Sequence, residues 1–149
     1  MENKLLEYLY FQPMHVTTFT DGGARGNPGP AAIGVIIKDT NGHTIDAYGE
    51  YLGEQTNNFA EYSALISALK RAKELGATEV ECVLDSELVT KQMQGLYKVR
   101  EPGLQKLFIQ AYNASTEFKK VKYRHTLREN NKEADAQVNK ILDKKNLPN

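Results

Sequence analysis

The order of the expected strands and helices limits the fold of this chain most strongly. Three short segments rich in β-branched and aromatic residues come first, and Asn41-Gly42 between the second and third is typical of a tight hairpin. Helices and strands alternate after that. The expected strands cover residues 15–20, 33–39, 44–51, 79–84 and 119–126, and the expected helices cover 58–75, 86–94, 104–117 and 131–145. Hairpins followed by strand–helix alternation predict an α/β fold with a mixed sheet covered by helices.

Size and charge limit the function classes only loosely. The chain has 149 residues, enough for one domain with its own core, and 19 Lys plus Arg balance 19 Asp plus Glu. Net charge therefore neither supports nor excludes nucleic-acid binding, and any phosphate affinity must come from a local patch. No apolar run approaches the roughly 20 residues of a membrane span. The single cysteine, Cys82, lies in an apolar run, so we expect a buried reduced thiol and a cytoplasmic protein.

Residues 1–13 differ in character from the rest of the chain. They lack the basic start, apolar centre and cleavage site of a signal peptide. Residues 7–12 resemble a protease cleavage sequence used in expression vectors, and Met14 is a plausible native start. We interpret residues 1–13 as a vector remnant or flexible extension and residues 14–149 as the domain. A short helix over residues 5–11 that packs on the domain is the alternative.

The stretch from Val16 to Pro30 places a carboxylate between a strand and a glycine-rich segment. Asp21 follows β-branched and aromatic residues and precedes a run of Gly, Asn and Pro. A strand that ends on Asp and continues into glycine presents the carboxylate at the sheet edge, where the backbone can approach a ligand. The alternative is a hairpin turn in which Asp21 bonds its own backbone.

Three more acids stand at the ends of predicted elements. Asp85 follows the fourth strand, while Glu61 and Asp135 lie in the first turns of predicted helices. Each acid taken alone fits an ordinary helix start or cap. Gathered at the carboxyl ends of the strands, the four would repel one another unless protons or cations neutralised them. Oxygen ligands without cysteine suit Mg²⁺ or Mn²⁺, and two such ions can support phosphodiester hydrolysis.

Four blocks of the sequence, taken in order, resemble ribonuclease H of type 1. They are Thr20-Asp21-Gly22-Gly23 with Gly26-Asn27-Pro28-Gly29-Pro30, then Thr56-Asn57-Asn58 with Glu61, then Asp85-Ser86, and finally Asn131-Lys132-Glu133-Ala134-Asp135. The resemblance runs from about Met14 to Leu142. It implies a ribonuclease H-like fold, a five-stranded mixed sheet in the order 3-2-1-4-5 with helices on both faces.

The same resemblance implies an activity. It implies an endoribonuclease that hydrolyses the RNA strand of RNA–DNA hybrids and leaves 5′-phosphate and 3′-hydroxyl ends. Two Mg²⁺ or Mn²⁺ ions would be held by Asp21, Glu61, Asp85 and Asp135, and water activated by the ions would attack the phosphate. We expect a monomer that does not bind membranes, and double-stranded RNA stays open as a second substrate.

By the same resemblance, Gly26, Asn27, Asn57 and Asn58 line the shallow groove of the hybrid. Short amides can exchange hydrogen bonds with 2′-hydroxyls and base edges, which mark an RNA strand. For Asn57 and Asn58 the alternative role is local, because Asn58 fits the N-cap of the helix that carries Glu61.

Two residues compete for a role beside the acids. His125 stands ten residues before Asp135, as a mobile catalytic histidine does in bacterial members of the family. A histidine can move a proton near neutral pH. Many short archaeal-type members carry an arginine near this place, and Leu127-Arg128-Glu129-Asn130-Asn131 resembles that version, which makes Arg128 the competitor. For His125, a surface loop residue without a task is the third possibility.

Three departures from the bacterial pattern stand out. A long basic insertion is missing, the chain has no Trp, and Glu87 stands where a glutamine often contacts substrate. The first two favour the short archaeal-type subgroup and predict weak, salt-sensitive binding. A hybrid-binding module without catalysis, or a different nuclease on the same fold, would be the competing functions. Four retained acids speak against the first, and Asn57-Asn58 with the Gly-Asn-Pro-Gly-Pro segment speaks against the second.

Overall fold

The computed structural model describes residues 14–145, which form a five-stranded sheet in the order β3-β2-β1-β4-β5. The pairs β1–β2 and β2–β3 are antiparallel, and the pairs β1–β4 and β4–β5 are parallel. Both the mixed sheet and its strand order agree with the sequence-based prediction. The strands are β1 (His15–Ala24), β2 (Gly29–Lys38), β3 (Thr44–Gln55), β4 (Glu79–Leu84) and β5 (Lys120–His125).

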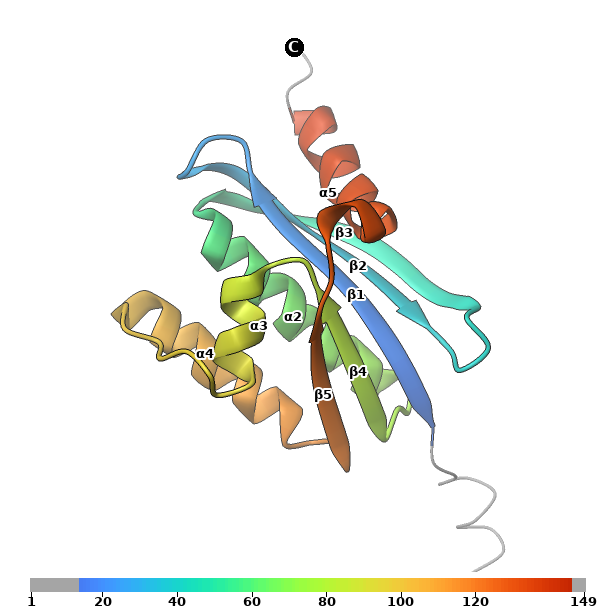
Figure 1. Cartoon of the computed structure of the whole chain (residues 1–149). Helices are drawn as coiled ribbons and strands as arrows, with labels where there is room; N and C mark the ends of the chain where they lie inside the picture. The colour runs from blue at the N-terminus through green and yellow to red at the C-terminus, as the bar shows by residue number, and fades with distance from the viewer. Residues whose placement is uncertain (1–13, 146–149) are drawn as a thin grey trace, which may run out of the picture.

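Helices cover both faces of this sheet, as predicted. On one face α5 packs against β1, β2 and β3, and on the other α2 packs against β1 and β2, with α4 against α2 (Figure 1). Each face has its own apolar core. The larger core lies under α2, and the smaller one joins Ala32 to Val138 and Leu142 of α5. The helices are α2 (Asn57–Glu74), α3 (Glu87–Met93), α4 (Pro102–Ser115) and α5 (Lys132–Lys145), with a short 3₁₀ helix η1 (Arg128–Asn130) between β5 and α5.

The first three strands are longer than predicted. β1 continues through Asp21 to Ala24 because its ladder with β2 runs on, pairing Asp21 with Gly34 and Ala24 with Ala31. The expectation that the first strand ends before Asp21 is therefore wrong. Glycine lacks a side chain but keeps both backbone hydrogen-bonding groups, so a ladder can pass through it. The turn itself begins at Arg25, whose N–H donates to the Pro30 carbonyl at 2.9 Å.

Helix α2 begins two residues earlier than an N-cap at Asn58 would place it. Thr56 is the N-cap, and its Oγ1 accepts from the Phe59 N–H at 3.1 Å. The N-cap expected at Asn58 is wrong, and Glu61 consequently lies in the second turn instead of the first. Threonine is also a common N-cap residue, although it ranks below asparagine, so local preference favoured the position that the structure does not use.

Two expectations concern parts of the chain beyond these elements. The nature of residues 1–13, including a helix over 5–11, lies outside the described residues and stays a prediction. The extent of one domain over residues 14–149 stays a prediction as well. Within residues 14–145, no helix is both long and apolar enough to cross a membrane. Cys82 is fully buried in β4, as expected, and burial raises the pKa of its thiol to about 12.

Candidate active site

Two glycines allow α2 and α5 to approach the backbone around Asp21 closely. A Cβ on Gly22 would lie 2.2 Å from the backbone of Ala60 in α2. A Cβ on Gly34, the β2 partner of Asp21, would lie 2.1 Å from the Ala134 carbonyl oxygen in α5. Both distances are far below any real contact, so only glycine fits at these two positions. The second turn of α2 and the first turn of α5 are thereby brought against opposite faces of the sheet beside Asp21.

Three carboxylates meet at this place. Asp21 of β1, Glu61 of α2 and Asp85 after β4 each offer an oxygen, and these three atoms lie within 4.8 Å of one another. Asp21 and Glu61 are buried, with 6% and 9% of their surface exposed. The cluster forms one wall of a pocket of about 450 Å³. The prediction that these acids converge from distant stretches of sequence is confirmed in geometry for these three.

The fourth predicted acid, Asp135, lines the same pocket from α5. Its Oδ1 lies 3.6 Å from Nη2 of Arg128, and its Oδ2 accepts from Nδ2 of Asn139 at 3.2 Å. Asp135 thus lies next to the cluster of three, and its two carboxylate oxygens contact Arg128 and Asn139.

Burial and the repulsion of neighbouring charges favour protons on Asp21 and Glu61 in the metal-free protein. The pKa of Asp21 is raised to about 7, first by burial, then by the charge of Asp85 and by a hydrogen bond with Asp135, while Arg128 lowers it. The pKa of Glu61 is raised well above its ordinary value, again mainly by burial and then by the charges of Asp21 and Asp85. The N–H of Gly22 opposes this shift by donating to Glu61.

This arrangement fits hard divalent cations. Within the described residues, Oε2 of Glu61 is buried and has no hydrogen-bond partner, although buried carboxylate oxygens are normally satisfied. A cation coordinated by Asp21, Glu61 and Asp85 would satisfy that oxygen and remove the repulsion among the three charges. The donor set contains oxygen alone, which suits Mg²⁺ or Mn²⁺.

The predicted substrate residues lie beside the carboxylates and also hold the local backbone. Oδ1 of Asn57 accepts from the Ala24 N–H at 2.8 Å, and Oδ1 of Asn27 accepts from the Asn57 N–H at 2.9 Å. These bonds tie the β1–β2 turn to the start of α2. Asn57 lines the pocket, Gly26 is exposed with a φ of 97° in the turn, and Asn58 is half-buried in the first turn of α2.

The two competitors for a role beside the acids occupy different positions. Arg128 lines the pocket next to Asp135. His125 is exposed at the end of β5, and its Nε2 lies 3.3 Å from the backbone oxygen of Asp85. It does not line the carboxylate pocket. Glu87 is exposed in the first turn of α3 and also lies outside that pocket.

Sequence reasoning did not single out two residues that the structure brings to the site. Arg25 lines the pocket, and its Nη2 lies 2.5 Å from Oδ1 of Asp143 near the end of α5. Asn131 is buried and donates to Oδ2 of Asp85 at 3.2 Å. Asn131 is the first residue of the last quoted block, but within that block only Asp135 was given a role. Arg25 lies between the two parts of the first block and was given no role.

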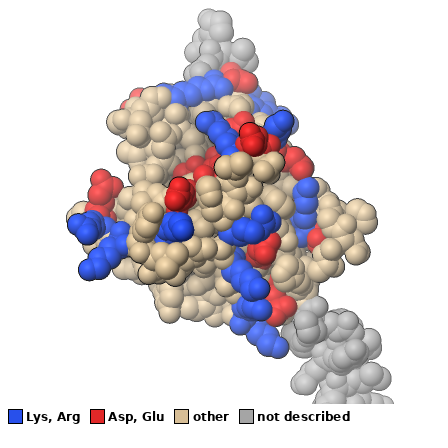
Figure 2. Space-filling view, viewed as in Figure 1, with Lys and Arg blue, Asp and Glu red and all other residues tan. Residues whose placement is uncertain are grey.

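The exposed cations of β5 are balanced by acids. Figure 2 shows Lys and Arg with Asp and Glu interspersed over the face on which Figure 1 places β5. Lys120 and Lys122 pair in register with Glu79 and Glu81 of β4, and Nη2 of Arg124 lies 3.2 Å from Oε1 of Glu81. This pattern is that of a solvated strand face.

Comparison with known proteins gives the family. A family model described as "Reverse transcriptase-like" matches residues 19–141. The crystal structure of RNase H1 from the halophilic archaeon Halobacterium salinarum superimposes with a TM-score of 0.85 at 38% identity, over 87% of this chain and 98% of that one. The chain belongs to the ribonuclease H type 1 family. The resemblance stated from the four sequence blocks is thereby confirmed.

Two further members of the ribonuclease H family are similar. LC11-RNase H1, solved in complex with an RNA/DNA hybrid, has a TM-score of 0.84 at 46% identity, over 87% of this chain and 98% of that one. The bifunctional protein Rv2228c of Mycobacterium tuberculosis is 41% identical over 131 residues, which cover 87% of this chain and 36% of that protein. The chain therefore spans about a third of the length of this mycobacterial relative.

Proposed function

We propose that this ribonuclease H family member is an endoribonuclease that hydrolyses the RNA strand of RNA–DNA hybrids, leaving 5′-phosphate and 3′-hydroxyl ends. The observation that carries the proposal is the convergence of Asp21, Glu61 and Asp85 within 4.8 Å in a pocket that Asn57 also lines. The carboxylates supply the chemistry, and the asparagine lies where an RNA strand would be read. The hybrid bound to LC11-RNase H1 supports the choice of substrate.

The residues that would hold two Mg²⁺ or Mn²⁺ ions are Asp21, Glu61, Asp85 and Asp135. Bound there, such ions lower the pKa of water and neutralise charge that develops on the leaving oxygen. The chain itself supplies the rigid placement. Asp21 sits inside a strand paired on both sides, and Glu61 is held over Gly22 by the close approach of α2. Side chains fixed in this way need little rearrangement when the phosphate arrives.

Recognition of the RNA strand would fall to the asparagines. Because the oxygens of the exposed residues Asn27 and Asn57 already accept backbone hydrogen bonds, their amide N–H groups would serve as donors for 2′-hydroxyls and base acceptors. A DNA strand lacks the 2′-hydroxyl. Preference for RNA at the cut strand follows from this difference.

A cation beside the acids would contact the phosphate. Arg128 is placed for this, because a guanidinium matches phosphate oxygens and lies beside Asp135 in the pocket. His125 is retained as the alternative, acting when the β5–α5 connection moves.

We also infer that the protein acts as a monomer in the cytoplasm. All four acids come from one chain and line one pocket. A free, buried Cys82 is compatible with a reducing compartment. Light scattering at micromolar concentration checks the oligomeric state.

One gel assay tests the proposed function. The same labelled strand is presented as RNA–DNA hybrid, RNA duplex, DNA duplex and single strand, with Mg²⁺, Mn²⁺ or chelator. We expect cleavage of the hybrid with either metal, none with chelator, and a drop below about a tenth of wild-type activity in Asp21→Asn, because the substitution removes a charged ligand at constant volume.

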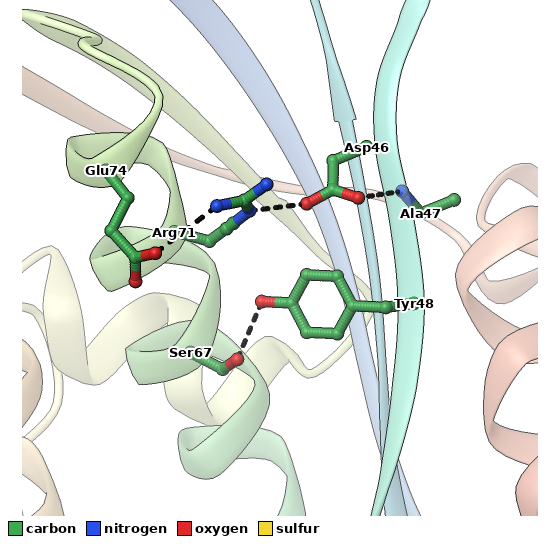
Figure 3. A network of polar contacts seen from close by, with 6 residues as sticks. All are labelled: Asp46, Ala47, Tyr48, Ser67, Arg71 and Glu74. Atoms are coloured by element: carbon green, nitrogen blue, oxygen red, sulfur yellow. Dashed lines mark hydrogen bonds and ion pairs between the residues drawn. The ribbon is translucent and has the colours of Figure 1, made fainter.

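The matched control is Asp46→Asn. Asp46 lies on β3 in a polar network with Arg71 and Glu74 (Figure 3), and its Oδ2 accepts from Nε of Arg71 at 2.6 Å. The same chemical change there leaves hybrid cleavage intact. Cleavage of DNA duplex but not of hybrid would overturn the proposal, and so would binding without cleavage under every metal condition.

A further inference from the structure

One buried amide joins the three chain segments that carry Asp21, Asp85 and Asp135. Asn131, which directly precedes α5, is only 2% exposed. Its Nδ2 donates to the backbone oxygen of Thr20 at 2.8 Å and to Oδ2 of Asp85 at 3.2 Å. Its own backbone oxygen accepts from the Asp135 N–H at 3.1 Å.

We propose that Asn131 is a positioning residue that orients the Asp85 carboxylate and fixes the start of α5 against β1. The inference rests on the proposed function in assuming that these carboxylates hold divalent cations. Asn131 itself touches neither the ion nor the substrate, and it acts through the carboxylates that do.

The two hydrogen bonds of the Asn131 amide fix two different parts of the site. One N–H donor on Oδ2 fixes the rotation of the Asp85 carboxylate and leaves Oδ1 for a cation. The bond to Thr20 anchors the same amide group to the residue before Asp21. Groups that hydrogen-bond to metal ligands set the orientation of those ligands, and loss of such a group lowers metal affinity or activity by about 10–100-fold.

The position of Asn131 in the chain extends this effect to the fourth acid. After β5 the chain passes η1 and enters α5, which lies across β1 and β2 (Figure 1). Asn131 is hydrogen-bonded to Thr20 of β1 and to Asp85 at the point where α5 begins. These bonds therefore also fix the position of Asp135, in the first turn of α5, relative to β1 and Asp85. A neutral amide is also the suitable group, since a carboxylate here would add like charge to the cluster.

The test measures Mn²⁺ binding to substrate-free protein by electron paramagnetic resonance, together with kcat and KM on the hybrid. We expect Asn131→Ala to weaken Mn²⁺ binding and to lower kcat by about 10–100-fold, with KM for the hybrid changed by less than about threefold. Asn131→Asp keeps the volume but loses the donor, so it lowers kcat to a similar extent. Asn131→Ser keeps a donor at shorter reach and falls between Asn131→Ala and wild type.

Tyr48→Phe is the control for a loss of stability alone. It removes a partly buried hydrogen bond of 2.7 Å to Ser67 (Figure 3). Neither residue lines the carboxylate pocket, so Tyr48→Phe leaves Mn²⁺ affinity and kcat unchanged. Folded Asn131→Ala or Asn131→Ser protein with Mn²⁺ affinity and kcat within about twofold of wild type would overturn the inference. Wild-type protein that binds Mn²⁺ but cuts no hybrid would overturn the proposed function, while a Mn²⁺ loss in Asn131→Ala would still support the role of Asn131.

Discussion

Arg128 lines the carboxylate pocket, whereas His125 lies outside it. Nη2 of Arg128 lies 3.6 Å from Oδ1 of Asp135, whereas the imidazole of His125 faces the backbone oxygen of Asp85. We expect Arg128→Ala to lower kcat/KM on the hybrid by about 10–100-fold, the range typical for a charge-assisted phosphate contact. His125→Ala should slow turnover by less than about threefold, since the imidazole does not line the carboxylate pocket.

Arg124→Ala is the control for loss of a positive charge near the site. Its side chain is exposed on β5 and pairs with Glu81, so the hybrid should be cut at the wild-type rate. A large loss in His125→Ala with little change in Arg128→Ala would reverse the assignment of the two roles. Steady-state rates of the three variants, measured at one salt concentration, decide the question.

Arg25 supports a second prediction about single residues. Its guanidinium stands on the pocket wall and is paired with the exposed Asp143. We expect Arg25→Ala to raise KM for the hybrid with little change in kcat, and to reduce the slope of log K against log salt by about 1, as loss of one phosphate contact does. Asp143→Asn frees the guanidinium and should not raise KM. An unchanged salt slope in Arg25→Ala would show that Arg25 serves only to hold α5.

Sequence reasoning found acids more readily than neutral site residues. Asp21, Glu61, Asp85 and Asp135 were identifiable because each stands at a boundary between predicted elements and because their joint order matches a family. Asn131 opens the last of the matching blocks, but its residue type predicts only an ordinary helix start. Its importance arises from hydrogen bonds to Thr20 and Asp85, which are 111 and 46 residues away, and no local pattern encodes those distances.

Close contact between elements depends on two glycines, and this gives a prediction about packing. Gly22→Ala and Gly34→Ala each force a methyl group into backbone of a helix, at 2.2 Å and 2.1 Å. We expect each to lower the free energy of unfolding by more than about 2 kcal/mol, toward the upper end of what overpacking costs, because backbone cannot rotate away. Hybrid cleavage falls as well, since α2 carries Glu61 and α5 carries Asp135.

Gly23→Ala is the matched control. Gly23 is the residue after Gly22 in β1, but an added Cβ would meet only the Val138 side chain of α5 at an ordinary 3.5 Å. Urea unfolding of the three variants, followed by circular dichroism, makes the comparison. Equal midpoints for Gly22→Ala and Gly23→Ala would contradict the close approach of α2.

The boundaries of elements show where local preference stops being informative. Glycines after Asp21 suggested a turn, yet β1 passes through them because β2 supplies partners on the next strand. Thr56 and Asn58 are both good N-caps, and the helix starts at the one whose hydroxyl reaches Phe59. Pairing with β2 decided where β1 ends, and the hydrogen bond from the Phe59 N–H to Thr56 decided where α2 begins. Residue preference alone did not decide either boundary.

The architecture of the whole molecule was predictable because every element has a clear apolar period and the family blocks fix their order. The charge distribution of the molecule is harder to predict from the sequence than its architecture. Equal numbers of acidic and basic residues conceal an uneven arrangement, in which surface lysines of β5 face acids of β4 and the buried acids face one another. The repulsion stored at the buried acids is a property of the whole fold, since it exists only once β1, α2 and β4 have assembled.

That repulsion couples folding stability to pH and to metal. Burial, followed by the charge of Asp85, raises the pKa of Asp21 to about 7 from 3.8. Between these two values the folded protein holds a proton that the unfolded chain releases, so the contribution of Asp21 makes the metal-free protein less stable as pH rises from about 4 to about 7, and the loss is complete above that range. The effect is at most about 4 kcal/mol. The pKa of Glu61 is raised as well, and it acts in the same direction.

Asp21→Asn therefore stabilises the metal-free protein at pH 8. We expect its Tm in chelator at pH 8 to exceed that of wild type by several degrees. At pH 4 the Tm values of the variant and of wild type should nearly coincide. Added Mn²⁺ reverses the order at pH 8, because it binds the folded wild type and its binding free energy adds to stability. Glu54→Gln, which changes an exposed carboxylate of β3, should leave both behaviours as in wild type. Melting curves at the two pH values, with and without metal, carry the test. An Asp21→Asn protein that melts below wild type at pH 8 in chelator would show that the carboxylates are not under repulsion, and the physical reason for a cation at this site would be lost.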